Sequence, residues 1–166
     1  LVEHFTNEEK GMYKADICRV AALYESGGYY FDTDIQVIKP IILGPEVEFS
    51  TVTNYDGGGF FQAFLAISKG HIIFERNLDL FVRYYEGDIA IEFPNEMGTF
   101  LLKLAYENEI EDNENMNTVL FSEVDLNKPR VWKQYQARYY KLKIRARVRS
   151  GNLCNWVVAD HKKREI

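Results

Sequence analysis

The chain has 166 residues, of which 46% are hydrophobic and 27% are charged, a size and balance typical of one globular domain. The composition excludes a disordered chain, a collagen and a coiled coil, and no apolar run approaches the roughly 18 residues that cross a bilayer. A net charge of −5 argues against bulk attraction to nucleic acid. Because a signal peptide and an apolar span are both absent from these residues, we expect a soluble domain.

The first predicted helix begins near Thr6, which forms a capping box with Glu9. Apolar side chains then recur at helical spacing as far as Tyr24, and the glycine pair at 27–28 ends the helix. Residues 29–38 are rich in aromatic and β-branched side chains, which predicts one continuous strand.

The rest of the chain alternates between strand and helix patterns. We expect strands at 48–53 and 60–68, helices at 72–85 and from about 95 to 108, and two late strands at 141–149 and 153–158. The strand at 141–149 alternates basic and apolar residues, so its basic face would be exposed. His71 directly precedes one helix and is expected to cap it or pack against it. The order of elements predicts an α/β fold with a mixed sheet.

The chain contains two cysteines, Cys18 and Cys154, which are far apart and form no CxxC pattern. This argues against a zinc site and against a disulfide framework. We expect both to be buried, reduced thiols.

Two carboxylates stand out near the end of the predicted strand at 29–38. Asp32 and Asp34 are two residues apart, so on a strand they would project from the same face, roughly 6.6 Å apart. Ligands bind at the carboxyl ends of strands in open α/β sheets. Mg²⁺ and Mn²⁺ take oxygen ligands and bridge to phosphates, so this pair suggests a metal-held diphosphate. A solvated acidic turn is the alternative interpretation.

A second polar pair precedes these carboxylates. Asp16 and Arg19 are three residues apart on the predicted helix and therefore share a face. Because the helix turns directly into the acidic strand, both pairs are expected near one crevice. A cation there would neutralise charge on a departing diphosphate. A helix-surface ion pair of little energetic value is the alternative.

These residues together resemble a known family. The segment Lys14-Ala15-Asp16-Ile17-Cys18-Arg19, followed by Leu23-Tyr24 and by Gly27-Gly28-Tyr29-Tyr30-Phe31-Asp32-Thr33-Asp34, is similar to the signature of DXD-containing glycosyltransferases. The family includes yeast-type mannosyltransferases, capsular polysaccharide sugar transferases and clostridial glucosylating toxins. The resemblance covers about twenty residues with the family's spacing.

A weaker resemblance continues downstream. The run 60–64 followed by Lys69-Gly70-His71 is similar to the family's Asn-Ala-Phe and Gly-His-Pro segment, with Gln62 in place of the usual Asn and Ile72 in place of Pro. Residues 94–99 read Pro-Asn-Glu-Met-Gly-Thr where the family usually has Thr-Gly-Pro. This departure leaves the acceptor side open.

The resemblance implies a GT-A-like (Rossmann-like) mixed sheet flanked by helices, with the family's opening strand and base-binding loop lying before Leu1. It further implies that residues 1–166 are a single catalytic domain within a longer polypeptide, with the other domains of that polypeptide as partners.

The resemblance also implies a UDP- or GDP-sugar donor and a Mn²⁺ or Mg²⁺ ion. Asp34 would ligate the metal, and Asp32 would bind the ribose or the sugar and reach the metal directly or through water. Asp16 and Arg19 would hold the donor sugar or its phosphate. Tyr30 would line the donor pocket, and Gln62 would lie on its donor side.

In the implied reaction, the metal and Arg19 neutralise the departing diphosphate while a hydroxyl of a glycan or protein acceptor attacks the sugar. An inverting enzyme also needs a carboxylate base, for which Glu96 and Asp56 are candidates; solvated loop carboxylates are the alternative interpretation. His161 is a candidate late metal ligand, the alternative being an exposed tail histidine.

Two other functions stay open from the sequence. A phosphatase of the haloacid dehalogenase type also carries Asp-x-Asp, but here Gln36 occupies the position of its Thr or Val. The preceding helix with Asp16 and the glycine turn also argue against it. A non-catalytic module that binds sugar nucleotides would retain the same residues without turnover.

Overall fold

The computed structural model describes residues 1–33, 35–37, 41–54, 57–113, 116–122, 157–159 and 164–165. Helices among them are α1 (Val2–Asn7), α2 (Gly11–Ser26), α3 (Ile72–Tyr85), the 3₁₀ helix η1 (Pro94–Glu96) and α4 (Met97–Asp112). Strands are β1 (Gly28–Phe31), β2 (Ile35–Val37), β3 (Phe49–Thr53), β4 (Phe60–Ile67), β5 (Thr118–Ser122), β6 (Val157–Ala159) and β7 (Arg164–Glu165).

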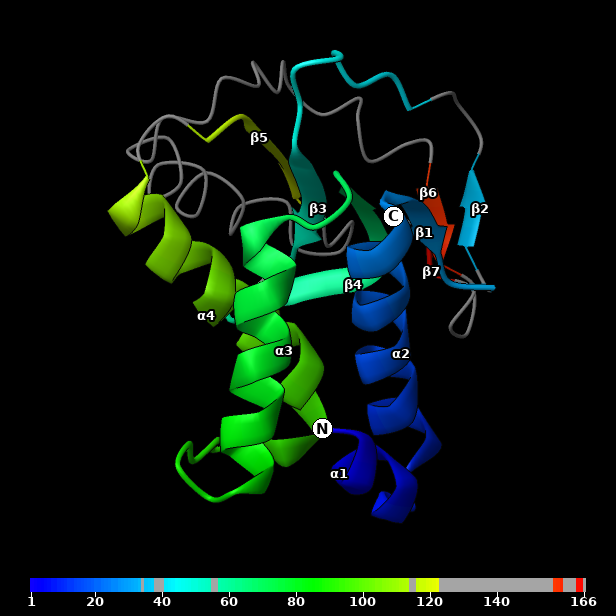
Figure 1. Ribbon diagram of the computed structural model, residues 1–166. Coiled ribbons are helices and arrows are strands. Elements are labelled where there is room, and N and C mark those ends of the chain that lie inside the picture. The colour runs from blue at the N-terminus through cyan, green and yellow to red at the C-terminus, as the bar shows by residue number, and fades with distance from the viewer. Residues whose placement is uncertain are drawn as a thin grey trace.

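The main sheet has the strand order β1-β4-β3-β5. Strand β4 is antiparallel to both of its neighbours, whereas β3 and β5 are parallel, so the sheet is mixed. Strands β2, β6 and β7 form a second, antiparallel sheet. The helices gather on one side of the main sheet (Figure 1). The predicted α/β class with a mixed sheet is confirmed.

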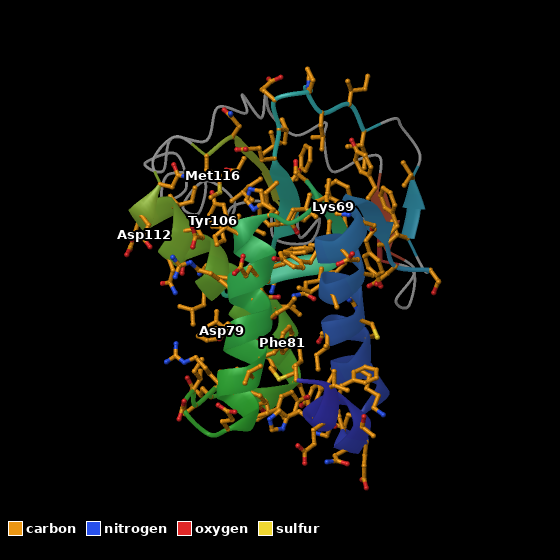
Figure 2. The ribbon with its side chains drawn as sticks, in the orientation of Figure 1. Lys69, Asp79, Phe81, Tyr106, Asp112 and Met116 are labelled. Atoms are coloured by element: carbon orange, nitrogen blue, oxygen red, sulfur yellow. The ribbon has the colours of Figure 1, made fainter. Side chains whose placement is uncertain are left out.

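Alternation along β4 divides the interior into two cores. Leu65 and Ile67 face the helices and pack with the buried side chains of α2, α3 and α4. Phe64 and Ala66 face the other way and pack with a smaller group that includes Val52 and Phe121. This is the period of two expected of a strand covered on both faces. The side chains deep in the helical core include Phe81 and Tyr106 (Figure 2).

The first helix differs from its prediction. Two helices occupy the segment: Thr6 lies inside α1, where its hydroxyl donates to the Val2 carbonyl at 2.9 Å. Helix α2 begins only at Gly11, and the Glu8 carboxylate accepts from the Lys10 amide at 2.8 Å. The predicted capping box is therefore wrong, because Thr6 lies inside α1 and the N-cap of α2 is Lys10.

The glycine turn is as predicted. Gly27 ends α2 with φ +65°, a backbone conformation that glycine adopts without strain. Its amide donates to the Leu23 carbonyl at 2.7 Å. The chain then enters β1 directly, so the end of α2 and the start of β1 are joined by a single tight turn.

The predicted strand at 29–38 is not continuous. Strand β1 ends at Phe31, and β2 begins at Ile35 in the other sheet. Between them the Ile35 amide donates to the Asp32 carbonyl at 3.1 Å, which closes a turn. Asp32 therefore lies in a turn after β1 and not on a strand as expected, and the turn preference of Asp explains the break. Asp34 lies outside the described residues.

Other predicted elements are confirmed. Strands 48–53 and 60–68 match β3 and β4, helix 72–85 matches α3, and His71 caps α3 by accepting from the Ile73 amide at 3.2 Å. Helix α4 begins after η1 and extends beyond its predicted end.

Some expectations fail or lie outside the described residues. Cys18 is exposed on α2, so the expectation of a buried thiol is wrong for it. Cys154 and the basic strand at 141–149 lie outside the described residues. No helix in the described part of the chain is long and apolar enough to cross a membrane.

Candidate functional site

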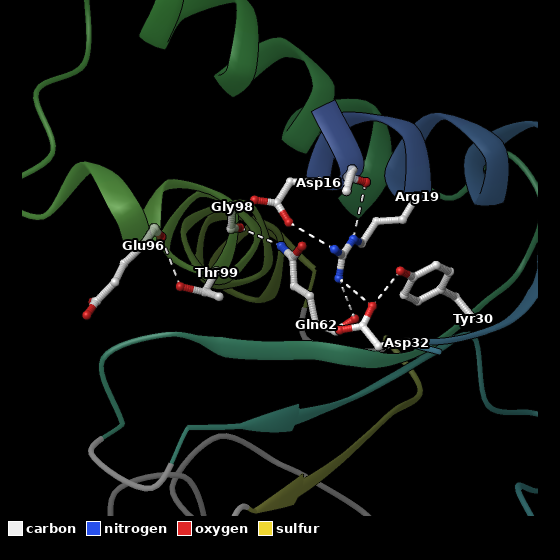
Figure 3. A network of polar contacts seen from close by, with 9 residues as sticks. Asp16, Arg19, Tyr30, Asp32, Gln62, Glu96, Gly98 and Thr99 are labelled. Carbon is white, nitrogen blue, oxygen red and sulfur yellow. Dashed lines mark hydrogen bonds and ion pairs between the residues drawn. The ribbon is translucent and has the colours of Figure 1, made fainter. Parts of the chain in front are cut away.

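Arg19 lies between two carboxylates from different elements. Its Nη2 is 3.3 Å from Oδ1 of Asp16, and its Nη1 is 3.3 Å from Oδ1 of Asp32. The side chains of Arg19, Asp16 and Asp32 are 11%, 16% and 24% exposed, so solvent screens these charges only partly. Figure 3 shows the three side chains converging between α2 and the sheet.

Helix geometry and backbone contacts fix the guanidinium. Asp16 and Arg19 are three residues apart on α2 and therefore lie on one face. Arg19 Nε donates to the Ala15 carbonyl at 3.2 Å, and Nη1 donates to the Gln62 carbonyl at 3.0 Å. The second bond ties the helix to β4.

The Asp32 carboxylate is held at the end of β1. Its backbone amide donates to the Ala63 carbonyl at 3.0 Å, which continues the pairing of β1 with β4. The Tyr30 hydroxyl donates to Asp32 Oδ1. The Arg19 guanidinium lies 4.9 Å from the centre of the Tyr30 ring, within cation–π distance. Asp32 thus has two side-chain partners besides its backbone support.

Burial changes the protonation equilibria of this cluster. Burial raises the pKa of the Asp16 carboxyl to about 6, and Asp32 adds to the rise while Arg19 opposes it. Burial and the hydrogen bond to Asp32 raise the pKa of Tyr30 to about 12. Tyr30 is therefore a hydrogen-bond donor at neutral pH, and Asp16 is a carboxylate that protonates unusually easily.

Gln62 connects this cluster to the start of α4. The side chain is 3% exposed, and its Nε2 donates to the Gly98 carbonyl at 2.5 Å. A Cβ added to Gly98 would lie 2.9 Å from the Asp16 Cβ and closer still to its carboxylate. The first turn of α4 therefore rests against Asp16.

The structure brings most of the predicted donor-side residues together: Asp16, Arg19, Tyr30, Asp32 and Gln62 form one connected cluster. Glu96 does not join it. It is exposed at the start of α4, and its carboxylate points away from Arg19 and Asp32 (Figure 3). Asp34, Asp56 and His161 lie outside the described residues. Gly98 was not predicted, because its proximity to Asp16 depends on packing between distant helices.

A divalent cation would find one carboxylate ligand in this cluster. Asp32 offers the hard oxygen ligand that Mg²⁺ and Mn²⁺ prefer. Within the described ranges, no three His, Cys, Asp or Glu residues are arranged to hold a metal ion. A cation at Asp32 would therefore take further oxygen ligands from Asp34, from water or from a diphosphate. The residues present fit such an ion, and a fixed guanidinium beside it suits an anionic ligand.

The segment that contains most of this cluster matches a family model. Residues 3–52 match the family model of the glycosyltransferase sugar-binding region containing the DXD motif. That range includes Asp16, Arg19, Tyr30 and Asp32. None of the curated proteins matches the chain.

A solved structure shares the fold. The PaToxG glycosyltransferase superposes with a TM-score of 0.54 over 86% of this chain, at 22% sequence identity. The chain spans about half of that structure, 49% of its length. The expected GT-A-like fold is in agreement with this likeness. Residues 3–52 are therefore similar to the sugar-binding region of the DXD-containing glycosyltransferases, the family that the sequence resembles.

Proposed function

We propose that residues 1–166 act as the catalytic domain of a metal-dependent glycosyltransferase. The donor is a UDP- or GDP-sugar, and the acceptor is a hydroxyl group of a glycan or a protein. The observation that best supports this proposal is the position of Arg19, which is held between Asp16 and Asp32 within the segment that matches the family model.

Each residue of the cluster has a role in donor binding. The Asp16 carboxylate accepts hydrogen bonds from sugar hydroxyls, and its ionised form is the better acceptor. Arg19 donates toward the diphosphate and neutralises the charge that develops as it departs. The Tyr30 hydroxyl donates a hydrogen bond to the Asp32 carboxylate and so orients it. Gln62 supports the site from β4.

Asp34 and Asp32 would hold the divalent ion, which when bound would supply further positive charge to the diphosphate. His161 is the candidate additional ligand from the C-terminal segment. Glu96 and Asp56 are the candidate carboxylate bases, of which Glu96 is exposed and lies outside the cluster.

Calorimetric titration tests the proposal. The purified protein is titrated with UDP- and GDP-sugars in the presence of Mn²⁺, of Mg²⁺ and of EDTA. We expect one nucleotide class to bind with the metal and to lose most of its affinity in EDTA. Asp34→Ala should abolish the metal-dependent part of binding while the thermal unfolding midpoint stays within a few degrees of wild type.

Asp79→Ala is the matched control, because Asp79 is an exposed carboxylate on α3 (Figure 2). It should bind the donor like wild type. Equal donor binding by Asp34→Ala and wild type would contradict the metal assignment. Failure of every nucleotide sugar to bind would contradict the proposed function.

Turnover separates the alternative functions. Release of nucleoside diphosphate from the bound donor marks a transferase, and release of inorganic phosphate from small phosphoesters marks a phosphatase. Donor binding with neither product marks a non-catalytic module. The match of residues 3–52 to a sugar-binding region favours the first outcome over the phosphatase.

A further inference from the structure

Gln62 contacts α2 through its backbone and α4 through its side chain. Its backbone carbonyl accepts from Arg19 Nη1 at 3.0 Å, while its side chain donates to the Gly98 carbonyl at 2.5 Å. Since Gln62 lies on the central strand β4, it fixes α2 and the start of α4 relative to the same point of the sheet. Among the described residues the buried Gln62 amide is paired through Nε2 only, and its Oε1 has no hydrogen-bond partner, so the bond to Gly98 limits the cost of burying this amide.

Gly98 allows α4 to approach Asp16 closely. It is buried in the first turn of α4, and an added Cβ would collide with the Asp16 side chain. Gly11 occupies the first turn of α2 and has no atom within 4 Å of an added Cβ. Only one of these two helical glycines is therefore required by its surroundings.

Further contacts anchor the same end of α4. The Tyr13 hydroxyl of α2 donates to Asn95 Oδ1 in η1 at 3.4 Å. A Cβ added to Gly59 would lie 2.9 Å from Thr99 Oγ1, so the loop before β4 also packs on this turn. The first turn of α4 is thus held against α2 and the sheet from several sides.

We propose that Gln62 and Gly98 are positioning residues, which place the first turn of α4 against Asp16 and so hold its carboxylate in contact with Arg19. Asp16 has α4 on one side and Arg19 on the other. Displacing the carboxylate from α4 would break the geometry of the Asp16–Arg19 pair. This inference rests on the proposed function only where donor affinity is the measured quantity.

A thermal-unfolding cycle tests the contact without any donor. Gly98→Ala is measured in the wild-type and Asp16→Ala backgrounds, with Gly11→Ala as the matched control in both. In the wild-type background we expect Gly98→Ala to lower the unfolding midpoint. In the Asp16→Ala background the carboxylate is gone and only the Cβ of residue 16 stays near the added Cβ, at 2.9 Å, so Gly98→Ala should lower the midpoint by a clearly smaller amount. Gly11→Ala should behave alike in both backgrounds.

Donor affinity tests the positioning role. Gly98→Ala and Gln62→Met should each weaken binding of the preferred nucleotide sugar about tenfold, a coupling expected of contacting residues. In the Asp16→Ala background, whose own affinity is lower, either change should have no further effect. Gln62→Met retains the carbonyl that accepts from Arg19, so its effect reports the lost bond to Gly98. Gly11→Ala should leave the affinity unchanged.

The two measurements keep the proposals distinguishable. If wild type binds no nucleotide sugar, the proposed function fails, while the unfolding cycle still decides whether Gly98 acts through Asp16. If Gly98→Ala lowers the midpoint equally in both backgrounds, the contact with Asp16 is not the cause, and the inference is wrong. If wild type binds donor and Gly98→Ala binds it equally tightly, the positioning role is wrong whatever the cycle shows.

Discussion

The contact between Arg19 and Asp32 joins the helical layer to the sheet. Arg19 reaches from α2 to a carboxylate that lies just beyond the end of β1, with 3.3 Å between Nη1 and Oδ1. The same nitrogen donates to the Gln62 carbonyl on the neighbouring strand. One guanidinium therefore sets the distance between the helix and the sheet edge at which a donor would bind.

Substitution of Arg19 should weaken donor binding in steps. A lysine keeps the charge but has a single ammonium, which cannot bridge Asp16, Asp32 and the Gln62 carbonyl as the guanidinium does. We expect Arg19→Lys to lose about tenfold and Arg19→Ala about a hundredfold in donor affinity, as for charge-assisted hydrogen bonds. Calorimetry checks both variants. Equal affinities of Arg19→Lys and wild type would show that only the charge matters.

The raised pKa of Asp16 predicts a pH-dependent stability. The folded-state pKa of about 6 exceeds the ordinary value of 3.8, so the folded protein binds more protons than the unfolded chain between these values. The contribution of Asp16 to the free energy of unfolding is therefore highest below pH 4 and falls as pH rises to about 6. The fall amounts to at most about 3 kcal/mol.

The variant Asp16→Asn should not show this fall. Its free energy of unfolding, relative to wild type, should increase between pH 4 and 7, as measured by urea titrations in EDTA. Asp79→Asn replaces an exposed carboxylate and is the control, with a difference that stays nearly constant over the same range. A constant difference for Asp16→Asn as well would show that Asp16 has an ordinary pKa.

An ion pair between α3 and α4 should stabilise the fold without affecting donor binding. Glu109 is 4% exposed and pairs with Arg76, which also lies 3.2 Å from Asp112. Arg76→Met leaves the Glu109 carboxylate buried without its cation and should cost about 2 kcal/mol. Asp112→Asn removes only an exposed partner and should cost less than about 0.5 kcal/mol.

Chemical denaturation measures both losses, and calorimetry should give the same donor affinity for each variant as for wild type. If Arg76→Met is as stable as wild type, Glu109 is protonated or solvated and the pair does not stabilise the fold.

Gly27 and Gly70 have nearly the same backbone conformation but different surroundings. Their φ angles are +65° and +66°; a Cβ at Gly27 would lie 2.7 Å from the Lys69 amide nitrogen, whereas Gly70 has open space. Gly70→Ala should cost about 1 kcal/mol through backbone strain. Gly27→Ala should cost at least about 3 kcal/mol, because backbone atoms must also shift. Urea denaturation of the two variants checks this, and equal losses would contradict the steric argument.

Local patterns in the sequence predicted much of the fold. Helix α3 and strands β3 and β4 follow from hydrophobic period, and the glycine pair marks the end of α2. The spacing of Asp16 and Arg19 places both on one helix face without any tertiary information. These inferences succeed because each depends on residues within a few positions of one another.

The break at Asp32 shows where local reasoning fails. Residues 29–38 are mostly aromatic and β-branched residues that favour strand, yet the register of β1 with β4 ends at Phe31, and β2 belongs to the other sheet. Which partner strand is available, and for how many residues, is a property of the assembled sheets. The predicted capping box at Thr6 fails for a different reason: Thr6 lies inside the separate helix α1, and α2 begins only at Gly11.

The sequence by itself thus determined the residue types of the site and their spacing along α2 and toward β1. Only the tertiary structure decided that Gln62 holds Gly98 and that α4 rests against Asp16. The physical reason is that hydrophobic period and turn propensity act between near neighbours, whereas these contacts depend on how closely two helices and a strand pack. A glycine that permits such an approach has no side chain, and hence no local signal, to reveal it.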